Sequence, residues 1–382
     1  LDTAALTAAT LDDPKIQALG AKVIGGLAEA TVKALGDKVA KLTGEQFAAL
    51  KATQVAALET AQITALTEDQ LGAMTAAQAK ALTPAQIGVL DADTQIGKLS
   101  TKAVAGMTFD QFAAMSATQI EALTDEQVAA LNATQIGAIG DNIAQFSVDD
   151  VKAISTKAIS ALSDTAIASF GEDQVKALTA DQLKAMKPDQ IKAFTTTQIG
   201  QMEVEQIQAL SATQIKALTD EQAGALTATQ IAGLSVAQVK SLSAAQIGQF
   251  DKDQLAALTT DHFAALSAAQ LGGIDAAAVE DLTQGQIQAI GTKAIGGLSD
   301  AAVKALGDKV TDLTAGQVAA LKATQVAALE TDQVAALGTD QVKALTATQI
   351  KAMTDTQVGA LTTTQIAELS VAQVKSLSAA QI

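Results

Sequence analysis

Residues 178–217 read LTADQLKA, MKPDQIKA, FTTTQIGQ, MEVEQIQA and LSATQIKA, which are five consecutive octads of one pattern. The pattern is Leu-Thr-x-x-Gln-Ile/Val-x-Ala. Counted from Leu11, 47 such repeats run to Ile382, and glutamine holds the fifth position in 32 of them. Because a repeat this short can bury its apolar side only against its neighbours, the sequence predicts a repeat scaffold. We expect an irregular start at residues 1–10 and one continuous octapeptide-repeat solenoid over 11–382.

The apolar side chains lie at positions one and six of each octad, so their spacing alternates between five and three residues. On a strand these two positions would face opposite sides of the sheet. On one unbroken helix each octad would advance about 80° beyond two turns, so the apolar stripe would wind around the cylinder. The chain is therefore expected to turn once in every octad.

Position two is the N-cap of a helix. Thr or Ser at position two and Gln at position five form a capping box, in which each side chain binds the backbone amide of the other residue. Pro84 and Pro188 fall at position three, the first helical residue, where a missing N–H has no cost. The predicted fold class is all-α, a solenoid of helices of about six residues, one per octad.

The phenylalanines indicate which positions form the core. Seven of the eight occupy position one or six, and the exception is Phe109 at position three. Small residues at positions seven and eight leave room for neighbouring backbones. We expect the inner face to consist of Leu at position one and Ile or Val at position six.

The octads are grouped into a longer repeat. The segment SVAQVKSLSAAQI occurs at 235–247 and again at 370–382, and 22–63 resembles 293–334, which together indicate a period of about 135 residues. Length variants interrupt the register: seven-residue variants begin at Leu35, Ile139 and Leu306, and a nine-residue variant begins at Leu90. A short variant is either a tolerated deletion or a deliberate bend or contact point.

Composition excludes several classes of function. All 25 basic residues are lysine, against 41 acidic residues and a net charge of −16. Nucleic acids and anionic membranes are bound through clustered positive charge, so neither is an expected partner. The absence of cysteine removes disulfides and thiol chemistry. No transmembrane segment is predicted. The chain starts at Leu1 and stops within an octad, which we interpret as a piece of a longer protein.

No catalytic, cofactor-binding or metal site is predicted. His262, the one histidine, replaces glutamine at position five and is interpreted as a variant capping residue. Paired acids lie mostly in first turns and are interpreted as surface acids that complement the helix dipole, and weak cation binding is the alternative. These acids are Asp12 with Asp13, Asp91 with Asp93, Asp149 with Asp150, and Asp251 with Asp253. The glycine pairs are read as corner packing: Gly25 with Gly26, Gly272 with Gly273, and Gly296 with Gly297.

Octads such as LTATQIKA at 345–352 and LTDEQVAA at 123–130 resemble the Ala/Thr/Gln-rich octapeptide tracts of large secreted or surface proteins of bacteria, including adhesin-like ones. The resemblance implies an extracellular, non-catalytic structural region and transfers no functional residue. We therefore expect a stalk, sheath or filament at a bacterial cell surface, self-associating through solenoid ends or sides. The alternative is an adhesin-type interaction module whose surface binds a protein or cell-surface partner.

Overall fold

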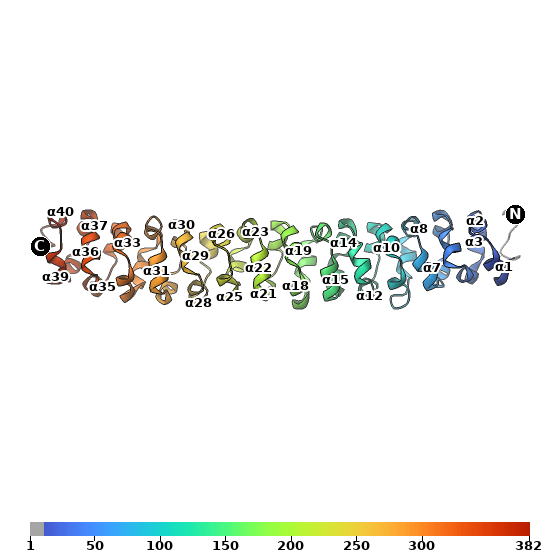
Figure 1. Ribbon diagram of the computed structural model, residues 1–382, viewed down its shortest axis with the longest axis horizontal. Helices are drawn as coiled ribbons and strands as arrows, with labels where there is room; N and C mark the ends of the chain where they lie inside the picture. The colour runs from blue at the N-terminus through green and yellow to red at the C-terminus, as the bar shows by residue number, and fades with distance from the viewer. Residues whose placement is uncertain (1–10) are drawn as a thin grey trace. The chain divides into compact units, whose positions relative to one another are not determined.

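The computed structural model describes residues 11–382, so the expected irregular start at 1–10 lies outside the described residues. The described chain is all-α, and no strand occurs in residues 11–382. It forms two compact units, of which the first ends at Phe194 and the second comprises Thr195–Ile382. Figure 1 shows that within each unit the short helices follow one another in chain order.

The first unit begins with Asp13–Ala18 (α1), Ala21–Gly25 (α2), Glu29–Ala34 (α3), Gly36–Lys41 (η3, a 3₁₀ helix), Gly44–Ala48 (α4), Ala52–Ala56 (α5), Thr60–Thr64 (α6), Glu68–Ala73 (α7), Ala76–Ala81 (α8), Pro84–Gly88 (α9) and Ile96–Lys98 (η4). It continues with Thr101–Gly106 (α10), Phe109–Ala113 (α11), Ala117–Glu121 (α12), Asp125–Ala129 (α13), Ala133–Ile139 (α14), Gly140–Gln145 (η5), Val148–Ala153 (α15), Thr156–Ile159 (α16), Asp164–Ala168 (α17), Glu172–Ala177 (α18), Ala180–Ala185 (α19) and Pro188–Lys192 (α20).

The second unit begins with Thr196–Gln201 (α21), Val204–Ala209 (α22), Ala212–Ala217 (α23), Asp220–Gly224 (α24), Ala228–Ala232 (α25), Val236–Ser241 (α26), Ala244–Ile247 (α27), Lys252–Ala256 (α28), Thr260–Ala265 (α29), Ala268–Gly272 (α30) and Ala276–Asp281 (η6). It continues with Gln284–Ala289 (α31), Ile295–Gly297 (η7), Asp300–Ala305 (α32), Gly307–Asp312 (η8), Ala315–Ala320 (α33), Ala323–Ala327 (α34), Thr331–Ala336 (α35), Thr339–Ala344 (α36), Ala347–Ala352 (α37), Asp355–Gly359 (α38), Thr363–Ala367 (α39) and Val371–Ser376 (α40).

The predicted helix start is confirmed. In α19 the Thr179 hydroxyl accepts from the Gln182 amide at 3.2 Å, and the Gln182 side-chain oxygen accepts from the Thr179 amide at 2.8 Å. Pro84 and Pro188 are the first residues of α9 and α20, as expected. In an ordinary octad the next apolar residue ends the helix, as Met186 does after α19 with an extended backbone of φ −69° and ψ 145°. The chain therefore turns once per octad.

Three successive octads make one coil of the solenoid. Helices pack against the helix three places further along, as α4 does with α7, α5 with α8, and α33 with α36. The apolar positions point inward: Ile215 at position six is fully buried, and Leu218 at position one is 4% exposed. Phe109, the exception noted above, is 50% exposed. The predicted inner face is confirmed, and within each unit it forms the core between stacked coils.

The seven-residue variants are accommodated by a change of helix type. In each of them a helix passes directly into a 3₁₀ helix, η3, η5 or η8, without the extended residue that separates ordinary octads. The turn is made by a glycine in the left-handed region, with φ 51° at Gly36, 57° at Gly140 and 53° at Gly307. Only glycine adopts this conformation without strain from a Cβ atom. The sequence LGDKV, shared by two of these variants, thus marks the place where the helix type changes.

Candidate functional site

The most elaborate polar arrangement is the glutamine at position five, and Gln182 shows it completely. Its side-chain oxygen completes the capping box of α19, while its Nε2 donates to the carbonyl oxygens of Val151 and Ile154, each at 2.7 Å. Both carbonyls lie at the end of helix α15, in the preceding coil. The last carbonyls of a short helix can accept further hydrogen bonds, so Gln182 caps the start of its own helix and the end of α15.

The same bonds recur along the chain and form what we call the glutamine ladder, the position-five glutamines that donate to the preceding coil. Gln135 donates to Val104 and Met107 at 2.9 and 2.8 Å, and Gln349 donates to Val318 and Leu321 at 2.8 Å each. These glutamines are almost completely buried. A buried amide is tolerated because its oxygen and nitrogen are both hydrogen-bonded.

Sequence reasoning assigned glutamine to capping and missed its burial and its bonds between coils. One signal pointed to them. A capping box accepts glutamate as well as glutamine, yet glutamate never occupies position five. A carboxylate could accept from the cap amide but could not donate to the carbonyls of the neighbouring coil.

Other side chains take the donor role where glutamine is absent. His262 Nδ1 accepts from the Thr259 amide at 3.2 Å, and its Nε2 lies 2.8 Å from the Leu234 carbonyl oxygen. The ring therefore occupies the place of a ladder glutamine, as the interpretation of a variant capping residue expects. In the seven-residue variant that begins at Leu35, Lys38 Nζ donates to the Leu11 carbonyl at 2.8 Å. Lys309 donates to Leu282 at 2.9 Å in the same way.

Asp150 corrects the interpretation of the paired acids as surface residues. It occupies position five of its octad and is only 3% exposed, whereas its neighbour Asp149 is exposed and pairs with Lys152 at 3.1 Å. Asp150 Oδ2 accepts from the Ser147 amide at 2.9 Å, but Oδ1 is buried without a hydrogen-bond partner. Acidic residues at position five are not surface acids, because that position faces the interior.

In each of the other pairs, one acid accepts hydrogen bonds from the local backbone: Asp12, Asp91 or Asp251. Asp12 is the N-cap of α1, and a hydrogen bond from the Lys15 side chain, then one from its amide, lowers the pKa of Asp12. Asp91 accepts from the Thr94 hydroxyl at 2.6 Å and its amide at 2.8 Å, and these bonds lower the Asp91 pKa. Asp251 caps α28 by accepting from the Gln254 amide at 2.8 Å. These carboxylates serve the local backbone.

The glycine pairs allow close backbone contacts, as the corner-packing interpretation expects. A Cβ atom at Gly297 would overlap the carbonyl oxygen of Ala268 in the neighbouring coil, and Gly273 has the same relation to Ala244. No Cβ-bearing residue fits at such a contact unless the backbone moves.

We expect Gly297→Ala to destabilise the second unit by about 1–3 kcal/mol, because the added methyl group must push two coils apart. Denaturant unfolding followed by circular dichroism measures this change. Gly291→Ala is the matched control, since no atom lies within 4 Å of a Cβ built there. Equal stability of the two variants would contradict the close contact.

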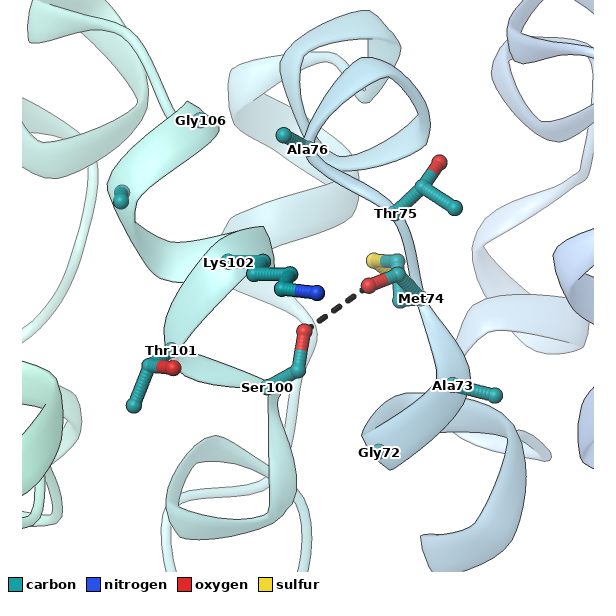
Figure 2. A pocket seen from close by; sticks show the side chains of 10 residues that line it. Gly72, Ala73, Met74, Thr75, Ala76, Ser100, Thr101, Lys102 and Gly106 are labelled. Carbon is teal, nitrogen blue, oxygen red and sulfur yellow. Dashed lines mark hydrogen bonds between the residues drawn. The ribbon is translucent and has the colours of Figure 1, made fainter.

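A hollow of about 650 Å³ lies beside α8 and α10. Figure 2 shows the Lys102 side chain extending into it next to Ser100, whose hydroxyl donates to the Met74 carbonyl at 2.8 Å. Most of its remaining lining is small: Gly72, Ala73, Ala76, Ala105 and Gly106. Position five of this octad is Ala103, which cannot donate a side-chain hydrogen bond. Ser100 instead makes the bond to the preceding coil that a ladder glutamine makes elsewhere. The hollow brings together no acid and base pair and no activated nucleophile.

Ion pairs connect neighbouring coils at the surface. Lys33 pairs with Glu59 at 3.2 Å, and Lys304 pairs with Glu330 at 2.9 Å, at equivalent places of the longer repeat. Lys343 lies 2.7 Å from Glu368, whose hydrogen bond and charge raise the Lys343 pKa. All these side chains are substantially exposed, so water and salt screen their attraction.

Residues 11–382 contain no group of three or more His, Cys, Asp or Glu side chains placed to hold a metal ion. Over the same residues, no helix combines the length and apolar character that crossing a membrane requires.

Comparison with protein families identifies the repeat. No curated protein matches the chain. The ALTTAQ repeat matches residues 39–76, 104–140, 143–180, 179–212, 199–236, 310–347 and 334–371, which together cover more than half of the sequence. The matched octads include those whose capping boxes and ladder glutamines are described above. The chain therefore belongs to the ALTTAQ repeat family.

Proposed function

We propose that this ALTTAQ repeat protein is a non-catalytic structural element, a stalk, sheath or filament at a bacterial cell surface. The observation that carries the proposal is the glutamine ladder. In octad after octad the Thr or Ser hydroxyl caps a helix, and the glutamine amide joins that helix to the preceding coil. The recurring polar groups are therefore engaged in holding coils together rather than presented to a substrate.

The surface composition supports a structural role over an adhesive one. Binding surfaces draw most of their energy from Trp, Tyr and Arg, and the sequence has none of the three. The alternative, an adhesin-type module, would have to bind its partner through Lys, Gln, Thr and carboxylates. The self-association that we propose needs no such anchors, because equivalent surfaces recur with the longer repeat.

Electron microscopy of the purified protein tests the proposal. We expect regular self-associated fibres, and small-angle scattering of the unassembled chain should give a radius of gyration well above the roughly 21 Å of a compact globule of this length. A monodisperse compact monomer that forms no fibres would contradict the filament. Specific capture by an isolated bacterial surface, without fibres, would favour the adhesin alternative.

A further inference from the structure

Asp150 lies at a place where the glutamine ladder is interrupted. Two other residues hold the equivalent place, immediately after a seven-residue variant, and both are glutamines. Gln46 donates to Ile16 and Leu19, at 2.9 and 2.6 Å. Gln317 donates to Ile287 and Ile290, at 2.7 and 2.8 Å.

In both cases the acceptors lie 30 and 27 residues earlier in the chain. The same spacing from Asp150 leads to the carbonyl oxygens of Ile120 and Leu123, at the end of α12. A carboxylate offers these carbonyls no hydrogen, because it has only acceptor atoms. Asp150 therefore leaves one corner of the first unit without the bond that Gln46 and Gln317 supply at theirs.

The unpartnered Oδ1 of Asp150 is enclosed by groups that do not neutralise it. Helix α15 packs against α13 and α18. On α13, the negative charge of Asp125 acts on Asp150, whereas Glu126 accepts hydrogen bonds from its own amide and from Thr124. On α18, Glu172 pairs with Lys176 at 2.7 Å, and Asp173 is exposed. On α15 itself, Lys152 pairs with the exposed Asp149.

Burial raises the pKa of Asp150, and the neighbouring Asp125 carboxylate raises it further, against the lowering effect of the hydrogen bonds from Ser147. A protonated Asp150 differs from the ionised form in the one respect that matters at this corner. It carries an O–H, so Oδ1 can donate to an oxygen atom beside it instead of remaining a buried, unsatisfied acceptor.

We propose that Asp150 makes the contact between α13 and α15 a proton-sensitive joint, held closed by a proton in acid and loosened when that proton leaves. The proton on Asp150 supplies the hydrogen-bond donor that a glutamine amide supplies elsewhere in the ladder. In the ionised form the buried charge is repelled by the Asp125 carboxylate and Oδ1 has no donor, so the coils separate locally to admit water. The remaining ladder positions stay closed, because a glutamine amide does not titrate.

The direction of the effect follows from linkage. The folded joint holds the proton more tightly than the open joint, in which Asp150 returns to its ordinary pKa near 3.8. The stability that the proton gives the closed joint is therefore fully present below the ordinary pKa. It is lost as the pH rises through the raised pKa of Asp150 in the closed joint. Between the two values, the equilibrium constant for opening increases about tenfold per pH unit.

Hydrogen exchange of the whole protein, measured by mass spectrometry from about pH 4 to pH 8 and corrected for the intrinsic exchange rate, tests the joint. In the native protein, peptides from α13 and α15 should lose protection with rising pH and then reach a plateau. In Asp150→Gln the same peptides should stay protected at all pH values. The peptide containing Gln317 serves as an internal control and should show no pH dependence in either protein.

Two further variants make the result specific. Asp149→Asn removes an exposed carboxylate from the same helix and should leave the pH dependence unchanged. Asp125→Asn should shift the loss of protection to lower pH without abolishing it, since it removes a charge that raises the pKa of Asp150 while Asp150 itself remains. Persistence of the full pH dependence in Asp150→Gln would overturn the proposal. Restoration of native protection at neutral pH by added calcium would also overturn it, by showing that the corner holds a cation rather than a proton.

Discussion

Replacing Ile215 with aspartate is expected to open the coils around α23 and to lower the stability of the second unit by about 4 kcal/mol or more. Ile215 is fully buried at position six. The substitution removes its apolar contacts and places an unpaired carboxylate in the core, so two large costs add. Denaturant unfolding and limited proteolysis both report the change.

Thr213→Asp is the matched control for this experiment. Thr213 lies in the same helix, two residues earlier, but is exposed at position four. A carboxylate in the first turn complements the helix dipole, so the control should be neutral or slightly stabilising. Similar losses in the two variants would mean that the register of buried and exposed positions is wrong.

Replacing Gln182 with glutamate is expected to cost about 3–5 kcal/mol at neutral pH, although the two side chains have almost the same shape. The glutamate can still accept from the Thr179 amide. It would, however, direct a second carboxylate oxygen at the carbonyls of Val151 and Ile154, where the amide now donates. The cost should shrink in acid, because a protonated glutamate regains one donor.

The control places the same carboxylate on the same helix. Ala180 is exposed at the first position of α19, so Ala180→Glu should leave the unfolding midpoint nearly unchanged or raise it slightly. A cost of Gln182→Glu no greater than that of Ala180→Glu would show that the ladder bonds contribute little to stability.

The local structure could be predicted from the sequence because several residues of each octad indicate it independently. Thr179 and Gln182 form a capping box, Pro188 marks a first helical residue, and the phenylalanines mark the buried positions. Each signal depends only on residues within one octad. Together they predict helix starts, helix lengths and the inner face.

The bonds between coils could not be predicted in the same way, because they depend on how many octads make a coil. Gln182 reaches residues 28 and 31 places earlier, and no feature within its octad states that distance. The burial of Asp150 was missed for the same reason, since an aspartate beside Asp149 resembles a first-turn surface acid. The preference for glutamine over glutamate was the one sequence feature that pointed beyond the octad.

The direction of the glutamine bonds has a consequence for how the protein is made. The ladder amides donate toward the N-terminus, to carbonyls between 26 and 32 residues earlier, as Gln62 and Gln119 do at the two limits. A ribosome synthesises those acceptors first, so each newly emerging coil meets a finished surface on which to close. Contacts of such short range favour rapid folding, and coil-by-coil completion spares the chain a search for distant partners. The length of the array can therefore change by tandem duplication without any change in the folding problem that a single coil must solve.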